Sequence, residues 1–67
     1  MADAVFKKVE LVGTSSESIS AAIVNAVAKA GPEGDMKWFE VVETRGRITD
    51  GKVDQYQVAI RVGILVK

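Results

Sequence analysis

The sequence predicts an α+β fold in which a β-α-β-β chain forms a three-stranded antiparallel sheet packed on one helix. Two observations lead to this expectation. Three segments alternate apolar and polar residues as strands do, and one segment between the first and second of them has the spacing of an amphipathic helix. The length of 67 residues and the absence of an internal repeat indicate one domain, residues 1–67.

The first strand is expected near Ala4–Val12. Val5, Val9 and Leu11 share one face there, with charged side chains opposite. The glycine that follows, Gly13, is expected to end the strand.

A helix is expected over about Ser15–Ala30. Thr14 and Glu17 stand three residues apart near its start, which suits a capping box. One side of this segment carries an apolar stripe rich in alanine, so the helix can approach a sheet closely. The stripe consists of Ile19, Ala22, Ile23, Ala26, Val27 and Ala30. The sequence "GPEG" at residues 31–34 is expected to end the helix.

Two long strands are expected over Met36–Ile48 and Lys52–Val66. The sequence "TDG" between them predicts a tight hairpin turn, because Asp-Gly is a strong turn signal. The last strand alternates regularly and is expected at the centre of the sheet, with one face under the helix. That face consists of Tyr56, Val58, Ile60, Val62, Ile64 and Val66. A single helix covers only one face of such a sheet, so the other face needs another partner.

Composition excludes several kinds of function. The chain has no cysteine and no histidine, which excludes disulfides, zinc–sulfur sites and a Ser-His-Asp arrangement. Nine basic and nine acidic residues are interspersed, a pattern that does not favour nucleic-acid binding. No apolar run reaches the roughly 20 residues that span a bilayer. We therefore expect a cytoplasmic protein that binds neither nucleic acid nor membranes, and whose small core is supplemented by oligomerisation.

The uncovered face of the sheet is expected to carry Trp38 and Gln57, whereas Phe39 and Val41 are expected to be core residues under the helix. A tryptophan on an uncovered face is more often an anchor of a subunit interface than a platform for ligand stacking. The amide of Gln57 offers a donor and an acceptor side by side, which suits the edge of a heterocycle.

Five carboxylates lack the spacing of metal ligands, so no metal site is expected. They are Glu10, Glu17, Glu40, Glu43 and Asp54. Solvated or paired surface charges are the favoured interpretation, although a symmetric assembly could bring copies of one carboxylate together around a cation.

Four segments closely resemble the dodecin family. They are "FKKVELVGTS" at residues 6–15, "WFEV" at 38–41, "RG" at 45–46 and "QYQVAIRVG" at 55–63. The resemblance covers nearly the whole chain in the right order. It implies a small flavin-binding protein of twelve copies, a homododecamer in the form of a hollow shell, with riboflavin or FMN held in pairs between subunits.

The resemblance also implies three cofactor-binding residues. Trp38 matches the tryptophan that stacks on the isoalloxazine ring, Gln57 the glutamine that hydrogen-bonds its pyrimidine edge, and Arg45 an arginine near the polar side chain of the flavin. Arg45 lies seven residues after Trp38, and in a regular strand this odd spacing would point it to the opposite face. Either a bulge precedes Gly46, or Arg45 serves a neighbouring subunit. A hairpin-end arginine in solvent, or one in an interface salt bridge, is the alternative interpretation.

Two positions depart from the family pattern. Lys37 precedes Trp38 where an acidic residue is usual, and Leu65 stands where many bacterial members have an arginine. Both sites can contribute phosphate or coenzyme A contacts in relatives, so a phosphate-specific or coenzyme A site is less expected than ring stacking.

The expected function is therefore flavin storage and photoprotection, without catalytic residues and without enzymatic activity. A flavin pair stacked between two tryptophans leaves no room for a substrate beside the ring. The alternatives are a ligand-free structural oligomer and a weakly active flavoenzyme.

Overall fold

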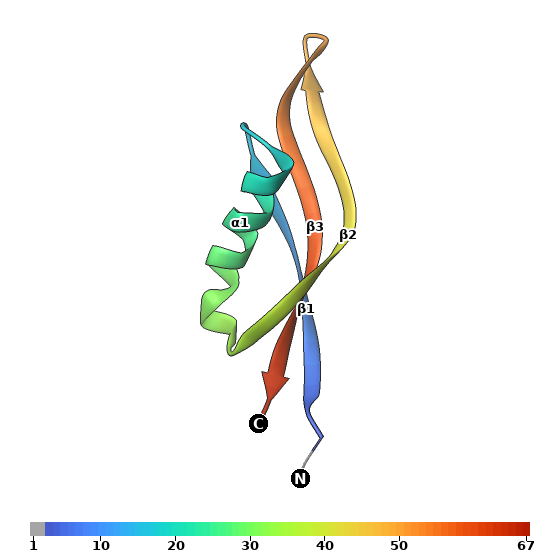
Figure 1. Ribbon diagram of the computed structural model, residues 1–67. Coiled ribbons are helices and arrows are strands. Elements are labelled where there is room, and N and C mark those ends of the chain that lie inside the picture. Colours follow the sequence, from blue (N-terminus) through green and yellow to red (C-terminus); the bar gives the residue numbers. More distant parts are fainter. Residues whose placement is uncertain (1–2) are drawn as a thin grey trace.

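The chain folds as one layer of three strands with one helix on it (Figure 1). A computed structural model describes residues 3–67. The elements are strand β1 (Val5–Ser15), helix α1 (Ile19–Ala30), a 3-10 turn η1 (Gly31–Glu33), strand β2 (Met36–Thr49) and strand β3 (Lys52–Val66). The strand order is β1-β3-β2, and β3 is antiparallel to both neighbours. The predicted fold class, the element order, the bounds of the last strand and its central position are confirmed.

Strand β1 continues through Gly13, contrary to the expectation that this glycine ends it. Gly13 pairs with Val58 in the ladder between β1 and β3. A Cβ atom at Gly13 would overlap the carbonyl oxygen of Ala22 and would lie 2.7 Å from the Cβ of Ala26. The glycine is therefore needed for the close approach of α1 to the sheet, and not for a break in the strand.

Helix α1 begins at Ile19, later than predicted, and the prediction of a capping box formed by Thr14 and Glu17 is wrong. Its N-cap is Ser18, which has an extended backbone. The Oγ atom of Ser18 accepts a 2.9 Å hydrogen bond from the backbone N–H of Ala21 in the first turn of the helix. Ser15 Oγ accepts the backbone N–H of Glu17 at 2.9 Å. The two serines thus form the turn into α1. Within residues 3–67, no helix has the length and the apolar character that crossing a membrane requires.

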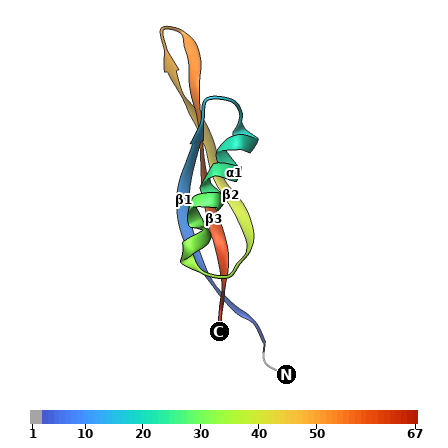
Figure 2. The same cartoon turned by 90° about the vertical axis from the view of Figure 1, so that its left-hand side faces the viewer.

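The hydrophobic core lies between α1 and the sheet face that Figure 2 shows behind the helix. Its buried residues are Ala22, Ala26, Ala30, Val58, Ile60, Val62 and Ile64. The alanine stripe and the middle of β3 therefore meet as predicted. Val66, at the end of the same face, remains exposed.

Phe39 and Val41 face the helix side of the sheet but are not core residues. They are paired with Val62 and Ile60, which lie under α1. Their side chains are nevertheless 47% and 46% exposed. The prediction of their side was right and that of their burial was wrong, because α1 packs on β1 and β3 rather than over β2.

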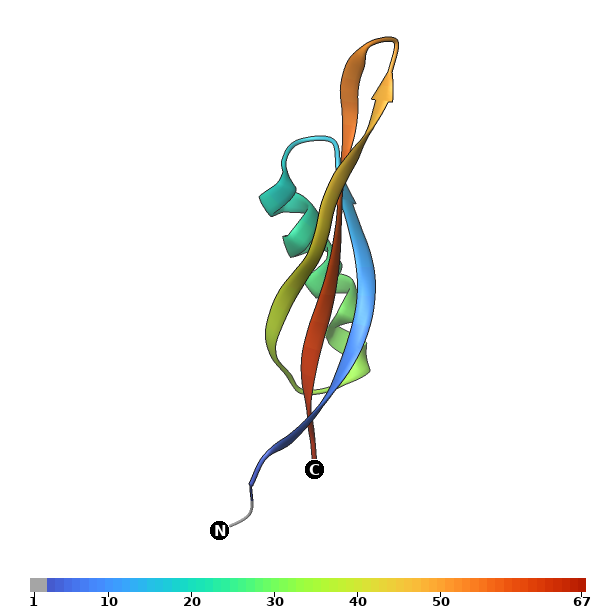
Figure 3. The same ribbon diagram turned by 90° about the vertical axis from the view of Figure 1, so that its right-hand side faces the viewer.

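The protomer is elongated. Its principal extents are 56 × 19 × 13 Å and its radius of gyration is 14.1 Å, whereas a compact domain of this length has about 11 Å. The β2-β3 hairpin extends beyond α1 (Figure 3). Its predicted tight turn is confirmed, with positive φ at both Asp50 (53°) and Gly51 (75°). Ile48 and Val53 on this extension are largely exposed, so the shape of the lone protomer favours association.

Candidate functional site

The sheet surface turned away from α1, which we name the open face, carries the predicted site residues. Figure 3 looks at the molecule from this side. Directly paired residues of neighbouring strands lie on the same face, so the register assigns the open face. Its members are Phe6, Lys8, Glu10, Val12 and Thr14 of β1, Gln55, Gln57, Ala59, Arg61, Gly63 and Leu65 of β3, and Trp38, Glu40, Glu43, Arg45 and Arg47 of β2.

Trp38 lies on the open face, as predicted, directly opposite Gly63. Its ring centroid is 5.8 Å from that of Phe6, and the two planes are tilted by 60°. The Nζ of Lys8 lies 5.8 Å from the indole centroid, within the range of a cation–π interaction. The tryptophan keeps 38% of its surface exposed, so it is supported from β1 and β3 and still offers aromatic surface to a partner.

A row of charged side chains crosses the open face next to Trp38. Glu40 accepts a 2.8 Å hydrogen bond from Lys8 Nζ and lies 3.9 Å from Nη1 of Arg61. Arg61 Nε donates in turn to Glu10 at 3.0 Å. The hydrogen bond from Lys8 lowers the pKa of Glu40; partial burial opposes this shift, and the charges of Lys8 and Arg61 reinforce it. Glu40 therefore stays ionised in mildly acidic solution and holds Lys8 beside the indole.

Arg45 and Gln57 meet at the other end of the open face. A register shift between Val41 and Glu43 inserts one extra residue into β2, and this bulge turns Arg45 toward the open face. Its Nε donates a 2.8 Å hydrogen bond to Oε1 of Gln57. Nε2 of Gln57 donates in turn to Gln55 at 2.8 Å. The structure therefore shows the bulge that the odd spacing of Trp38 and Arg45 allowed for.

One chain does not bring all three predicted residues together. Trp38 is opposite Gly63, and Arg45 is opposite Gln57. Gly63 and Gln57 are six residues apart along β3, which corresponds to about 20 Å. The indole and the Arg45–Gln57 pair therefore occupy separate positions along the open face of one chain.

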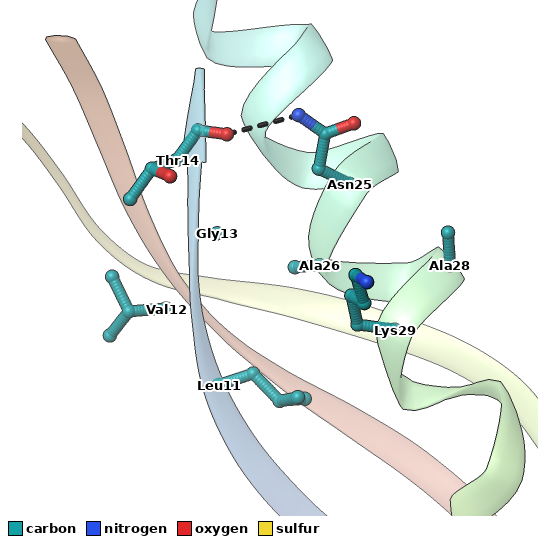
Figure 4. Close-up of a pocket in the computed structure, with 8 residues that line it drawn as sticks. All are labelled: Leu11, Val12, Gly13, Thr14, Asn25, Ala26, Ala28 and Lys29. Carbon is teal, nitrogen blue, oxygen red and sulfur yellow. Dashed lines mark hydrogen bonds between the residues drawn. The ribbon is translucent and has the colours of Figure 1, made fainter.

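A separate groove of about 380 Å³ lies between β1 and α1 (Figure 4). Asn25 of α1 donates a 3.0 Å hydrogen bond to the carbonyl oxygen of Thr14 across it. Lys29 is the charged side chain of its lining. None of the three predicted site residues lines this groove, so it is distinct from the candidate site.

Sequence reasoning missed Phe6, Lys8 and Gly63 as neighbours of Trp38. The contacts of Phe6 and Lys8 with the indole depend on the register of three strands, which no local pattern gives. Gly63 did carry a signal, because a glycine inside a strand often marks a close approach of another group.

Comparison with known proteins gives a consistent result. Residues 5–67 match the family model Dodecin. A curated dodecin of Thermus thermophilus is 52% identical over 60 residues, which cover 88% of this chain and 87% of that protein. The solved structure of a dodecin from Streptomyces davaonensis is similar, with a TM-score of 0.91 and 34% identity over 98% of both chains. The tt0972 protein from Thermus thermophilus has a TM-score of 0.89 and 47% identity over 97% of both chains.

The lowered pKa of Glu40 predicts a pH-dependent contribution to stability. A carboxyl whose pKa falls on folding stabilises the fold above its unfolded pKa of about 4, and this stabilisation is lost as the pH falls through the lower folded value. Glu40→Gln should therefore be slightly less stable than wild type at pH 7, and the difference should close in strong acid. Thermal unfolding of both proteins from pH 7 down to pH 2 measures this.

Glu17→Gln is the matched control, since the Glu17 carboxylate takes part in none of the ion pairs seen in residues 3–67. It should follow the wild type throughout. A difference between wild type and Glu40→Gln that stays constant with pH would contradict the role given to the carboxylate charge.

Proposed function

The chain belongs to the dodecin family, and from this premise we propose that it stores flavin, with the isoalloxazine ring of riboflavin or FMN stacked on Trp38 between subunits. Dodecins are small flavin-binding proteins and not enzymes. The observation that carries the proposal is the placement of the indole on the open face, where it is supported from behind and still partly exposed.

The residues of the open face fit the chemistry of a flavin ring. An aromatic plane offers offset stacking, worth about 0.5–1.5 kcal/mol beyond the burial of area. Gln57 offers amide donor and acceptor groups for the polar pyrimidine edge, and Arg45, which holds Gln57 through a 2.8 Å hydrogen bond, offers a cation for the polar tail. These three residues would hold the ligand, and a bound flavin would supply an electron-poor ring that absorbs visible light.

The site is completed by another copy of the chain. The strand positions opposite Trp38 and opposite Arg45 are about 20 Å apart along β3, so we infer that a ligand on Trp38 of one protomer would meet the polar pair of a second one. The elongated shape and the exposed apolar side chains favour association. We therefore propose a homododecamer with closed symmetry, located in the cytoplasm, in which flavins are bound in pairs.

Trp38 would also protect the cell from photoreactive flavin. An indole is a good electron donor, so Trp38 in van der Waals contact would give one electron to the photoexcited ring and take it back, with no net reaction. Storage and photoprotection would then follow from the same contact. The paired arrangement leaves no space for a substrate beside the ring, which is why the proposal is a binding protein and not a flavoenzyme.

The assembly can be measured directly. Native mass spectrometry at micromolar concentration should give a mass close to twelve times 7.2 kDa, because a lone protomer of this size has too small a core to be stable alone. The same mass should be found by light scattering. A stable monomer or dimer would contradict both the shell and the site between subunits.

Trp38→Phe tests the stacking and the electron donation together. Phenylalanine keeps an aromatic ring but is a much poorer electron donor than indole. The variant should still assemble, and it should bind flavin about 2- to 12-fold more weakly, which corresponds to the free energy of an aromatic pair. Its bound flavin should fluoresce more than that of the wild type. Titration of riboflavin, followed by flavin fluorescence, measures both quantities.

Phe39→Leu is the control for this experiment, because Phe39 is the next aromatic residue but lies on the helix side of the sheet. It should keep the quenching of the wild type. Bound flavin that fluoresces like free flavin in the wild type would show that Trp38 does not contact the ring. A colourless wild-type protein that takes up no added flavin would favour a ligand-free structural oligomer.

Arg45→Ala tests the contact with the phosphate of FMN. A hydrogen bond to a charged group is worth about 1.5–3 kcal/mol, so the variant should lose roughly tenfold or more in affinity for FMN and less for riboflavin. Wild-type protein should bind the two ligands comparably, because Leu65 offers no second cation. Titrations of both ligands on both proteins measure this.

Arg47→Ala is the matched control, since Arg47 is on the same strand and face but is held by Asp54 at 3.0 Å. It should affect the two ligands equally. Equal losses of riboflavin and FMN in Arg45→Ala would exclude a phosphate contact for Arg45.

A further inference from the structure

Gly63 stands inside β3 without a conformational reason to be glycine. Among the described residues, the glycines with positive φ are Gly34 and Gly51, so the backbone at position 63 is one that any residue adopts. A glycine inside a strand weakens it, because it loses more entropy on folding and packs no side chain. Its presence therefore calls for a steric explanation.

The indole of Trp38 occupies the space that a side chain at position 63 would need. A Cβ atom built on Gly63 would lie at most 2.5 Å from the indole atoms Cε2, Cζ2 and Cδ2, and real Cβ atoms essentially never come within 3.0 Å of a neighbour. Gly63 is buried although it lies on the open face. The aromatic ring of Trp38 thus lies across the bare backbone of β3.

Side chains of β1 hold the indole from the other side of β3. Lys8 is the β1 partner of Gly63, as Trp38 is its β2 partner, so the three residues form one row across the sheet. Lys8 is fixed by Glu40 at 2.8 Å, and Phe6 packs against the indole at 5.8 Å. The orientation of the ring is therefore set by a bare strand beneath it and two side chains beside it.

We propose that Gly63 is the positioning residue for Trp38: its missing side chain lets the indole lie against β3 and fixes the plane on which the flavin ring stacks. This inference rests on the proposed function and adds to it the residue that orients the stacking surface. A ring already held in its binding orientation loses little freedom when a ligand stacks on it, which favours affinity. Electron donation needs the same close contact, so quenching depends on the same plane.

Gly63→Ala tests the proposal, with two independent measurements. In the flavin-free protein, the emission and the near-ultraviolet circular dichroism of the single tryptophan should change, since the ring must leave its place. With riboflavin added, binding should be up to roughly tenfold weaker, the loss expected for a disturbed aromatic contact, and bound flavin should be less quenched. Gly31→Ala is the matched control, because a Cβ there meets nothing within 4 Å, and all signals should stay as in wild type.

A double variant separates positioning from general damage to the sheet. If Gly63 serves Trp38, adding Gly63→Ala to Trp38→Ala should cause no further loss of thermal stability or assembly, because the two effects are coupled. If Gly63→Ala alone does not assemble, recovery of assembly in the double variant supports the proposal. Equal damage in both backgrounds, or an unchanged tryptophan signal in flavin-free Gly63→Ala, overturns it. A changed tryptophan signal in a protein whose wild type binds no flavin would support the positioning and refute the flavin function.

Discussion

The coverage of one sheet by one short helix is the constraint on which the rest of the structure depends. Helix α1 has 12 residues, whereas the strands have 11, 14 and 15. It buries its alanine stripe against β1 and β3 and leaves β2, the hairpin extension and the whole open face without cover. The hydrophobic effect then favours contact with other copies of the chain. The surface that the fold leaves uncovered is also the surface that carries Trp38, Arg45 and Gln57, so the proposed assembly and the proposed ligand binding would share one origin.

The antiparallel register divides the open face into rows with different roles. Lys8, Gly63 and Trp38 form the row that holds the indole, and Glu10, Arg61 and Glu40 form a row of ion pairs beside it. These pairs are exposed and contribute little stability individually. Their effect is to neutralise the charges of this part of the face, which leaves the indole as its main surface for a partner. The bulge in β2 then brings Arg45 into the row of Gln57.

Local sequence patterns predicted the helix and the strands. The start of α1, the roles of two glycines and the face of Arg45 depend on tertiary contacts, which local patterns do not give. Alternation gave the bounds of β3, and Asp-Gly gave the hairpin turn. The start of α1 was misplaced because Thr14 and Glu17 have the spacing of a capping box, whereas Thr14 is part of β1 and Ser18 caps the helix. A side chain at Gly13 or Gly63 would overlap a group from a distant part of the chain; a glycine inside a strand indicates such an approach, but the sequence does not identify the group. The face of Arg45 depended on a bulge, which a period of two does not encode. The faces of Trp38 and Gln57 were predicted correctly because the pairing of β2 with β3 is regular from Trp38 to Val41, before the bulge, and β3 alternates regularly.

The relative contributions of ring stacking and of phosphate binding in the proposed site follow from which basic side chains are already paired with carboxylates. Arg61 and Lys8 are paired with glutamates, and Arg47 is paired with Asp54. The hydrogen bonds that Asp54 accepts from Arg47 and Thr49 lower its pKa. Arg45 differs from them, since its closest partner is the neutral amide of Gln57 at 2.8 Å and the carboxylate of Glu43 lies farther away, at 3.9 Å. Most cations of the open face are thus already neutralised, and a phosphate would find one weakly committed arginine. A site that recognises its ligand through an aromatic plane and an amide would accept any ligand with the right ring. Such a site would suit a protein that stores flavins with different tails.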